Sequence, residues 1–87
     1  MAQVEIYSSP FCGYCYKAKS IFKKKGVAFV EHDVFTDTAK QDELEKRSPG
    51  RTSLPQIFID GARIGGCDDL MALDREGKLN PMLGIAA

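Results

Sequence analysis

The stretch SPFCGYCYKAKS, residues 9–20, decides both the fold and the chemistry of this chain. Cys12 and Cys15 are separated by two residues, a spacing at which two thiols can form a disulfide, bind a metal or lie inert in a core. Pro10 ends the apolar segment that precedes the pair, and a helical pattern of apolar residues begins at Gly13. The pair is therefore expected where a strand ends and a helix begins.

This position favours a reactive thiol. A cysteine attacks a disulfide as its thiolate, and the unpaired N–H groups at the start of a helix stabilise a negative charge. Cys12 lies at this start, whereas Cys15 lies one turn further in and is better shielded from solvent. We therefore predict that Cys12 is the nucleophile and that Cys15 is the resolving thiol.

The other interpretations of the pair have less support. A closed zinc site needs four ligands, and beyond the pair the chain offers only Cys67 and the single His32. His32 stands between two acidic residues of a predicted strand, so we expect an exposed residue and neither a ligand nor a base. Cys67 is either structural or a site of oxidation or glutathionylation. No metal site is predicted.

The composition excludes several classes of function. The 87 residues suffice for one domain, taken as residues 1–87, and the hydrophobic fraction of 44% is typical of globular proteins. Twelve basic and twelve acidic residues balance, so we expect neither nucleic acid nor a membrane surface as a partner. No apolar run is long enough to span a bilayer. The first residues do not resemble an export signal, and the cysteine count is odd, so we expect a cytoplasmic protein.

The hydrophobic pattern predicts an α/β fold in the order β-α-β-α-β-β-α. The strand–helix–strand start implies two parallel strands joined by a right-handed crossover. Asp60 and Gly61 are typical of a two-residue hairpin turn, which adds two antiparallel strands. Asp68 is the predicted cap of the third helix, and Gly77 is its predicted end. The predicted strands are 3–8, 27–34, 56–59 and 62–64. The predicted helices are 13–25, a second that starts from a cap within 36–38 and reaches 47, a third over 68–77, and a short helical turn that starts at 80. A four-stranded mixed sheet flanked by helices would bury their apolar faces.

Three separated motifs resemble the glutaredoxin family, namely CGYC at 12–15, RTSLPQIFI at 51–59 and GGCDDL at 65–70. The resemblance covers residues 3 to about 83 and is to small bacterial glutaredoxins of the dithiol type. It implies a thioredoxin-like fold in which Pro55 follows a cis peptide bond. It also implies glutathione as a co-substrate, with no tightly bound cofactor.

The resemblance implies the contacts of a glutathione site. The cysteine of glutathione would pair with the backbone of Leu54, in the manner of an added strand. The γ-glutamyl group would meet the backbone of Cys67 and both the backbone and the carboxylate of Asp68, with Gly66 allowing a close approach. Tyr14 would form a wall beside the reacting sulfur. The residues implied to bind glutathione are Tyr14, Arg51, Leu54, Pro55, Gly66, Cys67 and Asp68.

Some details of this site differ from the family pattern or stay open. The glycyl carboxylate of glutathione needs a cation or an amide donor, and the candidates in falling order are Arg51, Arg47 and Gln41. Ser9 stands where the family often has a lysine, so one positive charge near the nucleophile is missing. Gly13 stands where proline is common, which restores a backbone N–H and relaxes the first helical turn.

The implied activity is the reduction of protein–glutathione mixed disulfides, and of protein disulfides such as that of ribonucleotide reductase, by a monomer. One alternative is a [2Fe–2S] protein in which Cys12 of each of two copies and two glutathiones ligate the cluster, as some relatives without the proline do. Another is a thioredoxin-type dithiol reductant. Thioredoxins carry a WCGPC motif, and this chain has no tryptophan.

Overall fold

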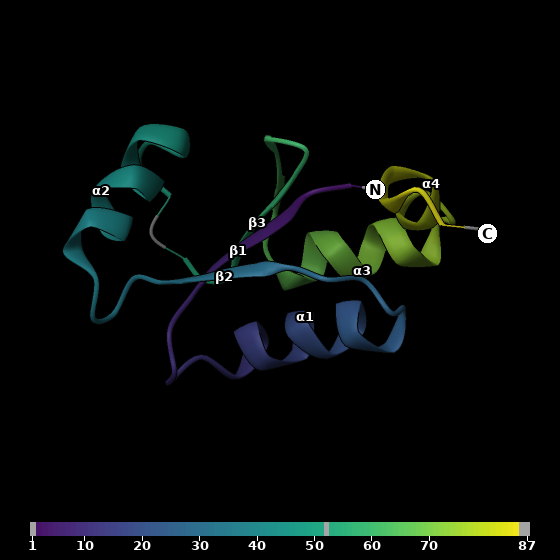
Figure 1. The fold of residues 1–87 in the computed structure, drawn as a ribbon, viewed down its shortest axis with the longest axis horizontal. Helices are drawn as coiled ribbons and strands as arrows, with labels where there is room; N and C mark the ends of the chain where they lie inside the picture. Colours follow the sequence, from purple (N-terminus) through teal and green to yellow (C-terminus); the bar gives the residue numbers. More distant parts are fainter. Residues whose placement is uncertain (1, 52, 86–87) are drawn as a thin grey trace.

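A computed structural model describes residues 2–51 and 53–85 of the chain. Strands and helices follow one another in the predicted order, and a short fourth helix ends the fold (Figure 1). The elements are β1 (Val4–Ser8), α1 (Gly13–Lys24), β2 (Val30–Asp33), α2 (Thr38–Arg47), β3 (Gln56–Ile59), β4 (Ala62–Gly65), α3 (Cys67–Arg75) and α4 (Leu79–Leu83).

The strands form one mixed sheet in the order β2-β1-β3-β4, which confirms the predicted architecture. β1 and β2 are parallel, whereas β3 is antiparallel to both β1 and β4. The turn between β3 and β4 has positive φ angles at Asp60 (52°) and Gly61 (83°), as the predicted type of hairpin turn requires. Because β1 and β2 are parallel, the loops that follow them leave the same edge of the sheet.

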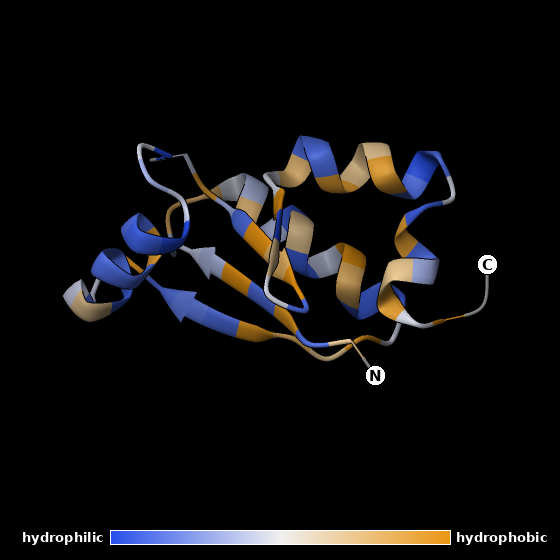
Figure 2. Cartoon of the chain, turned by 90° about the horizontal axis from the view of Figure 1, so that it is seen from above, coloured by the Kyte–Doolittle hydropathy of each residue, from blue (hydrophilic) through white to orange (hydrophobic). Residues whose placement is uncertain are grey.

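Side chains on β1 and β3 alternate between two hydrophobic clusters, one on each face of the sheet. Ile6 and Ile57 belong to the larger cluster, which also takes in the buried faces of α1 and α3. These two helices run side by side in Figure 1. Tyr7 and Phe58 point the other way and pack with Leu44, the buried residue of α2. The remaining surface of α2 is mostly hydrophilic (Figure 2).

Several predicted boundaries differ from the structure by one to three residues. The third helix ends at Arg75 and not at residue 77, and the last helical turn begins at Leu79 and not at residue 80. β2 begins at Val30 and not at residue 27, because the Val27 N–H bonds the Phe22 carbonyl at 3.0 Å and so belongs to the turn that closes α1. Lys25 is the C-cap of α1 and not part of it. Asp37 caps α2 as predicted, because its carboxylate accepts two backbone N–H groups of the first turn.

A partly buried charged cluster ties α2 to the sheet. Arg47 donates to the two carboxylate oxygens of Glu5 at 3.0 Å each and to the Tyr7 hydroxyl at 2.9 Å. The guanidinium carbon of Arg47 also lies 3.9 Å from the centre of the Phe58 ring. Arg47 holds the pKa of Glu5 below its ordinary value. Burial, together with a hydrogen bond to Glu43, raises the pKa of Tyr7 to about 12.

His32 belongs to this cluster, so the prediction that it is exposed was wrong. Its Nε2 lies 3.2 Å from a carboxylate oxygen of Glu5, and its side chain is 11% exposed. Its ring centre lies 4.7 Å from that of Tyr7. The acidic neighbours of His32 in the sequence suggested solvent, but its partner comes from the adjacent strand, which the sequence does not reveal.

The Glu5–Arg47 pair generates a prediction about stability. Replacing Arg47 with methionine should lower the free energy of unfolding at pH 7 by about 2 kcal/mol, because a partly buried carboxylate loses its charged donor. The folded-state pKa of Glu5 lies below its ordinary value of 4.5, so the contribution of the pair is full above that pH and is lost as the pH falls further. The variant should therefore lose less stability than the wild type on acidification, which urea unfolding at a series of pH values measures. Lys46→Met, an exposed neighbour on α2, is the matched control, and an equal acid response of Arg47→Met and wild type would contradict the account.

Candidate active site

Cys12 occupies the N-cap position of α1, as predicted from its place between a strand and a helix. Its backbone is extended, with φ −103° and ψ 109°, and its sulfur accepts the backbone N–H of Cys15 at 3.2 Å. The Cys12 side chain is partly exposed. Its thiol also lies 3.5 Å from the Leu54 carbonyl oxygen, to which it donates. The sulfur is therefore reachable from solvent and faces hydrogen-bonding groups from two parts of the chain.

Cys15 lies under this sulfur and is fully buried. Burial is the main cause that raises the pKa of its thiol to about 12, and the neighbouring Cys12 adds to the effect. Cys15 is thus protonated at neutral pH and out of reach of large reagents. Both cysteines are free thiols, so the structure is that of the reduced pair.

The segment before β3 faces Cys12 from the opposite side. The peptide bond between Leu54 and Pro55 is cis, as the resemblance implied. The side chain of Gln56 secures this segment by donating to the Ser53 carbonyl at 2.8 Å. Gln56 in turn accepts from Arg63 Nε at 3.0 Å, so a residue of β4 braces the loop.

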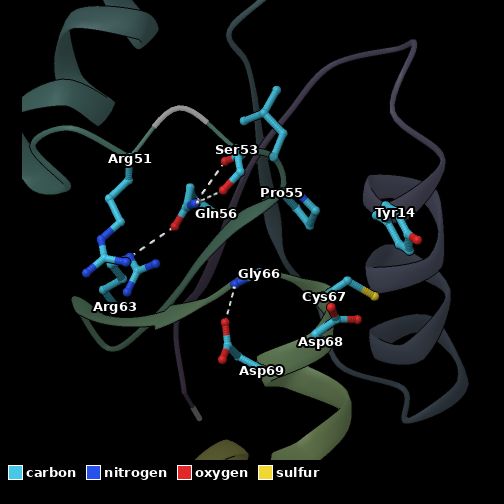
Figure 3. Close-up of a pocket in the computed structure, with 11 residues that line it drawn as sticks. Tyr14, Arg51, Ser53, Pro55, Gln56, Arg63, Gly66, Cys67, Asp68 and Asp69 are labelled. Carbon is cyan, nitrogen blue, oxygen red and sulfur yellow. Dashed lines mark hydrogen bonds between the residues drawn. The ribbon is translucent and has the colours of Figure 1, made fainter.

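The start of α3 forms a third wall. Gly66 is the N-cap of this helix, so the prediction that Asp68 is the cap was wrong. The carboxylate of Asp69, in the first helical turn, accepts the Gly66 N–H at 2.9 Å. Asp68 is exposed and points into the pocket (Figure 3). Gly65 has φ 121°, and a Cβ there would lie 2.2 Å from an Asp69 carboxylate oxygen. Because the Gly66 N–H engages the Asp69 carboxylate, the neighbouring Asp68 carboxylate is left for another partner.

Residues near the start of α1, before β3 and at the start of α3 line a pocket of about 350 Å³. Neither Cys12 nor Cys15 lines it, and the pocket adjoins the Cys12 sulfur through Leu54. All seven residues that the resemblance assigned to glutathione lie on it (Figure 3). Four further lining residues were not predicted, namely Ser53, Gln56, Arg63 and Asp69. Arg51 and Arg63 converge at one end of the pocket, and Asp68 and Asp69 lie toward the other. The pocket therefore offers separate positive and negative ends to a ligand that carries both charges.

Cys67 lines the pocket but is buried. Its sulfur lies 3.8 Å from that of Met71. Burial is the main cause that raises the pKa of the Cys67 thiol. The side chain therefore packs as a small apolar residue, and the backbone is the part of Cys67 that is offered to a ligand.

A second hollow of about 410 Å³ adjoins the first, and Arg51 and Leu54 line both. Gln41 lines the second hollow, where its amide also donates to the Val34 carbonyl at 2.5 Å. Arg47 lines neither hollow, because Glu5 and the Tyr7 hydroxyl engage its guanidinium. Of the three candidates for a ligand carboxylate, Arg51 and Gln41 thus line a hollow, whereas the Arg47 guanidinium is engaged within the fold.

The described residues contain one group with the spacing of a metal site, formed by Glu5, His32 and Glu43. Its donor atoms lie within 4.8 Å of one another. Both oxygens of Glu5 are engaged by Arg47, and Glu43 accepts from Tyr7 and Lys40. A cation would have to displace these donors, so the group is better described as an ion-pair network.

Comparisons with known proteins agree with this geometry. A family model described as Glutaredoxin matches residues 4–64. The chain is similar to Glutaredoxin 3 of Escherichia coli K12, with 54% identity over 83 residues that cover 95% of this chain and 99% of the relative. It also resembles the solution structure of a glutaredoxin from Brucella melitensis, with a TM-score of 0.81 and 44% identity, covering 100% of this chain and 96% of that one.

A third similar structure is a complex with glutathione. The crystal structure of a buckwheat glutaredoxin–glutathione complex has a TM-score of 0.84 and 34% identity to this chain, and the match covers 95% of this chain and 81% of that one. These likenesses confirm the predicted thioredoxin-like fold. Within the described residues, no helix has the length and apolar character needed to cross a membrane.

The burial of the three cysteines predicts the outcome of alkylation. Iodoacetamide at pH 7 should modify the reduced native protein once, at Cys12, because Cys15 and Cys67 are buried and their pKa values are raised. Mass spectrometry with peptide mapping identifies the modified residue. The same treatment in guanidinium chloride should modify all three cysteines. Labelling of Cys15 or Cys67 in the native protein at a rate comparable with Cys12 would contradict this assignment.

Proposed function

The chain belongs to the glutaredoxin family, and from this premise we propose that it reduces mixed disulfides between proteins and glutathione, with Cys12 as the nucleophile. The chain is a glutathione-dependent thiol–disulfide oxidoreductase. The observation that carries the finer proposal is the pocket beside the Cys12 sulfur. Seven residues from three distant parts of the sequence, each expected to bind glutathione, line that one pocket.

The proposed position of glutathione follows from the polar groups of the pocket. The cysteinyl part would pair with the Leu54 backbone, whose carbonyl is 3.5 Å from the Cys12 sulfur. The γ-glutamyl part would reach the start of α3, where the first N–H groups of a helix have no helical partner. The Asp68 carboxylate would receive its ammonium group. A Cβ at Gly66 would lie 3.4 Å from the Pro55 carbonyl, so a larger residue there would narrow the pocket.

The glycyl carboxylate is assigned to Arg51, with Gln41 as the amide donor nearby. Both residues line the second hollow, which Leu54 separates from the Asp68 end of the pocket. A tripeptide extended across Leu54 would thus have its negative end near a guanidinium and its positive end near a carboxylate. Opposite charges at the two ends fix the direction in which the ligand binds.

The proposed reaction proceeds by two thiol–disulfide exchanges. The Cys12 thiolate attacks the glutathione sulfur of the mixed disulfide, the bond between the two sulfurs breaks, and the protein leaves as a thiolate that takes up a proton. Cys12 then carries glutathione. A second glutathione thiolate attacks the sulfur of the bound glutathione. The bond to Cys12 breaks, which releases glutathione disulfide and regenerates the Cys12 thiolate. Each exchange conserves electrons, so the net reaction consumes one molecule of glutathione, and the other half of the glutathione disulfide comes from the substrate.

Cys15 supports a second route. Its thiol can attack the Cys12 sulfur, which releases glutathione and leaves an intramolecular disulfide that glutathione must later reduce. The raised pKa of Cys15 makes this attack slow unless a base removes its proton. The same dithiol would reduce protein disulfides, such as that of ribonucleotide reductase. We assign the activity to a monomer in the cytoplasm.

A [2Fe–2S] cluster shared by two copies is the second candidate. The observation in its favour is that Cys12 is partly exposed and that nothing lies within 4 Å of the position of a Cβ at Gly13. Cys12 would be the ligand from each copy, because Cys15 and Cys67 are buried. Protein purified without air would show the visible absorbance of a cluster and sediment as a dimer. A colourless monomer that is active with glutathione would dismiss this candidate.

The two routes are separated by replacing the resolving thiol. Cys15→Ser should retain at least about half of the activity on a glutathionylated peptide, because the second glutathione resolves Cys12 without it. The same variant should lose activity on substrates with an intramolecular disulfide. Cys12→Ser should abolish both activities. Loss of both in Cys15→Ser would favour a thioredoxin-type reductant and contradict the glutathione route.

Asp68 and Asp69 provide a matched pair of substitutions. Asp68→Ala should raise the KM for glutathione roughly five- to tenfold with little change in stability, because it removes a carboxylate that contacts the ligand. Asp69→Ala should change KM less than Asp68→Ala does. It should lower the free energy of unfolding by about 1 kcal/mol, because it removes the carboxylate that accepts the Gly66 N–H at the start of α3. Steady-state kinetics and urea unfolding measure the two effects. The reverse pattern would show that the ligand meets Asp69 instead.

A further inference from the structure

An exposed aromatic surface borders Cys12 on the side away from the glutathione pocket. It consists of Phe11, Tyr16 and Phe35, which we call the aromatic patch, and their exposures are 78%, 72% and 57%. Phe11 and Phe35 touch edge to face, with ring centres 4.8 Å apart. Phe11 comes from the loop after β1 and Phe35 from the loop after β2, two loops that leave the same edge of the sheet.

The helical spacing places Tyr16 on this side. Residues two apart on a helix point about 200° away from each other, so Tyr16 lies on the flank of α1 opposite Tyr14. Tyr14 lines the glutathione pocket, on the α3 side of Cys12. Lys19, three residues after Tyr16, pairs with Glu31 of β2 at 2.7 Å, which fixes the Tyr16 flank on the β2 side.

The two loops that carry the phenylalanines are held by local hydrogen bonds. The Asp33 carboxylate accepts the N–H of Phe35 at 2.8 Å, and the Ser9 hydroxyl accepts the N–H of Phe11 at 3.3 Å. The rings are therefore presented by fixed loops, and a partner that covers them does not have to order these segments first.

The exposed aromatic side chains are grouped near Cys12 and are not scattered over the surface. The large hydrophobic side chains that are exposed in the described part of the chain are Phe11, Tyr14, Tyr16, Val30 and Phe35. Two members of the patch, Phe11 and Tyr16, lie within four residues of Cys12 in the sequence, and the third, Phe35, touches Phe11. Grouped apolar surface of this kind marks a binding site, whereas single exposed residues such as Val30 are ordinary on protein surfaces.

We propose that the aromatic patch docks the protein half of the mixed disulfide and selects substrates with apolar side chains next to the glutathionylated cysteine. This inference rests on the proposed function. In the exchange, three sulfurs lie in line, so the sulfur of the departing protein is about 4 Å, two S–S bond lengths, from that of Cys12. Glutathione occupies the α3 side of Cys12. The protein half then covers surface on another side of Cys12, where Phe11 is the chain neighbour of Cys12 and touches Phe35.

The test uses two synthetic peptides, each carrying one glutathionylated cysteine. One peptide has leucine on both sides of that cysteine, and the other has serine. The wild type should process the leucine peptide with a kcat/KM about five- to tenfold higher, since burying on the order of 50 Å² of leucine against the rings corresponds to about tenfold. Phe11→Ser combined with Phe35→Ser should reduce this preference below about twofold.

The controls separate docking from chemistry. The double variant should keep its rate with the serine peptide and with the cysteine–glutathione mixed disulfide, because neither substrate reaches the rings. Val30→Ser removes exposed apolar surface at the start of β2, away from the loop that carries Phe35, and should keep the full preference for leucine. Equal rates for the two peptides in the wild type, or a preference that survives in the double variant, would overturn the proposal.

Three further outcomes would each give the rings a different role or none. A double variant that also loses activity on the small mixed disulfide would mean that the rings position Cys12, which overturns docking as their role. Sedimentation that shows a wild-type dimer and a monomeric double variant would assign the patch to a second copy of the chain and overturn substrate docking. A wild type inactive on both peptides and on the small disulfide would overturn the proposed function itself, and this inference with it.

Discussion

The hydrogen bond from the Cys15 backbone N–H to the Cys12 sulfur, at 3.2 Å, is the contact on which the chemistry of this protein depends. It exists because Cys12 caps α1, a position whose side chain faces unpaired N–H groups. The same geometry places Cys15 one turn below, in the core, where its thiol stays neutral. One local feature, the start of one helix, thus gives two chemically alike residues different environments, which is the basis of the different roles proposed for them.

The sheet then decides what surrounds this sulfur. The antiparallel pairing of β3 with β1 brings the Leu54–Pro55 segment to within 3.5 Å of Cys12, and the hairpin with β4 delivers the start of α3. The pocket that we propose for glutathione lies on this side and is lined by side chains of both signs of charge. The parallel partner β2 brings Phe35 to the other side, where the surface is aromatic. Cys12 therefore stands between a polar pocket suited to a small peptide and an apolar surface suited to a protein.

The sequence predicted the parts of this arrangement that local chemistry determines. The cysteine spacing, the break at Pro10 and the Asp60–Gly61 turn each act through a few neighbouring residues, and the elements that they predict are present. The resemblance, not periodicity, supplied the cis bond before Pro55. What could not be predicted depends on side chains that meet across the fold.

Arg63 lines the pocket and is held there by its hydrogen bond to Gln56. His32 is covered by a cluster whose members come from β1, β2 and α2. Asp68 and Asp69 are chemically identical neighbours, so which of them accepts the Gly66 N–H at the start of α3 depends on the path of the backbone at Gly66.

The central claim, that Cys12 carries glutathione in this pocket, is tested most directly by a crystal structure of Cys15→Ser after reaction with glutathione disulfide. The predicted result is a disulfide from Cys12 to glutathione, with the γ-glutamyl group at Asp68 and the glycyl carboxylate near Arg51. Glutathione bound to Cys67, or lying in the opposite direction along Leu54, would contradict it.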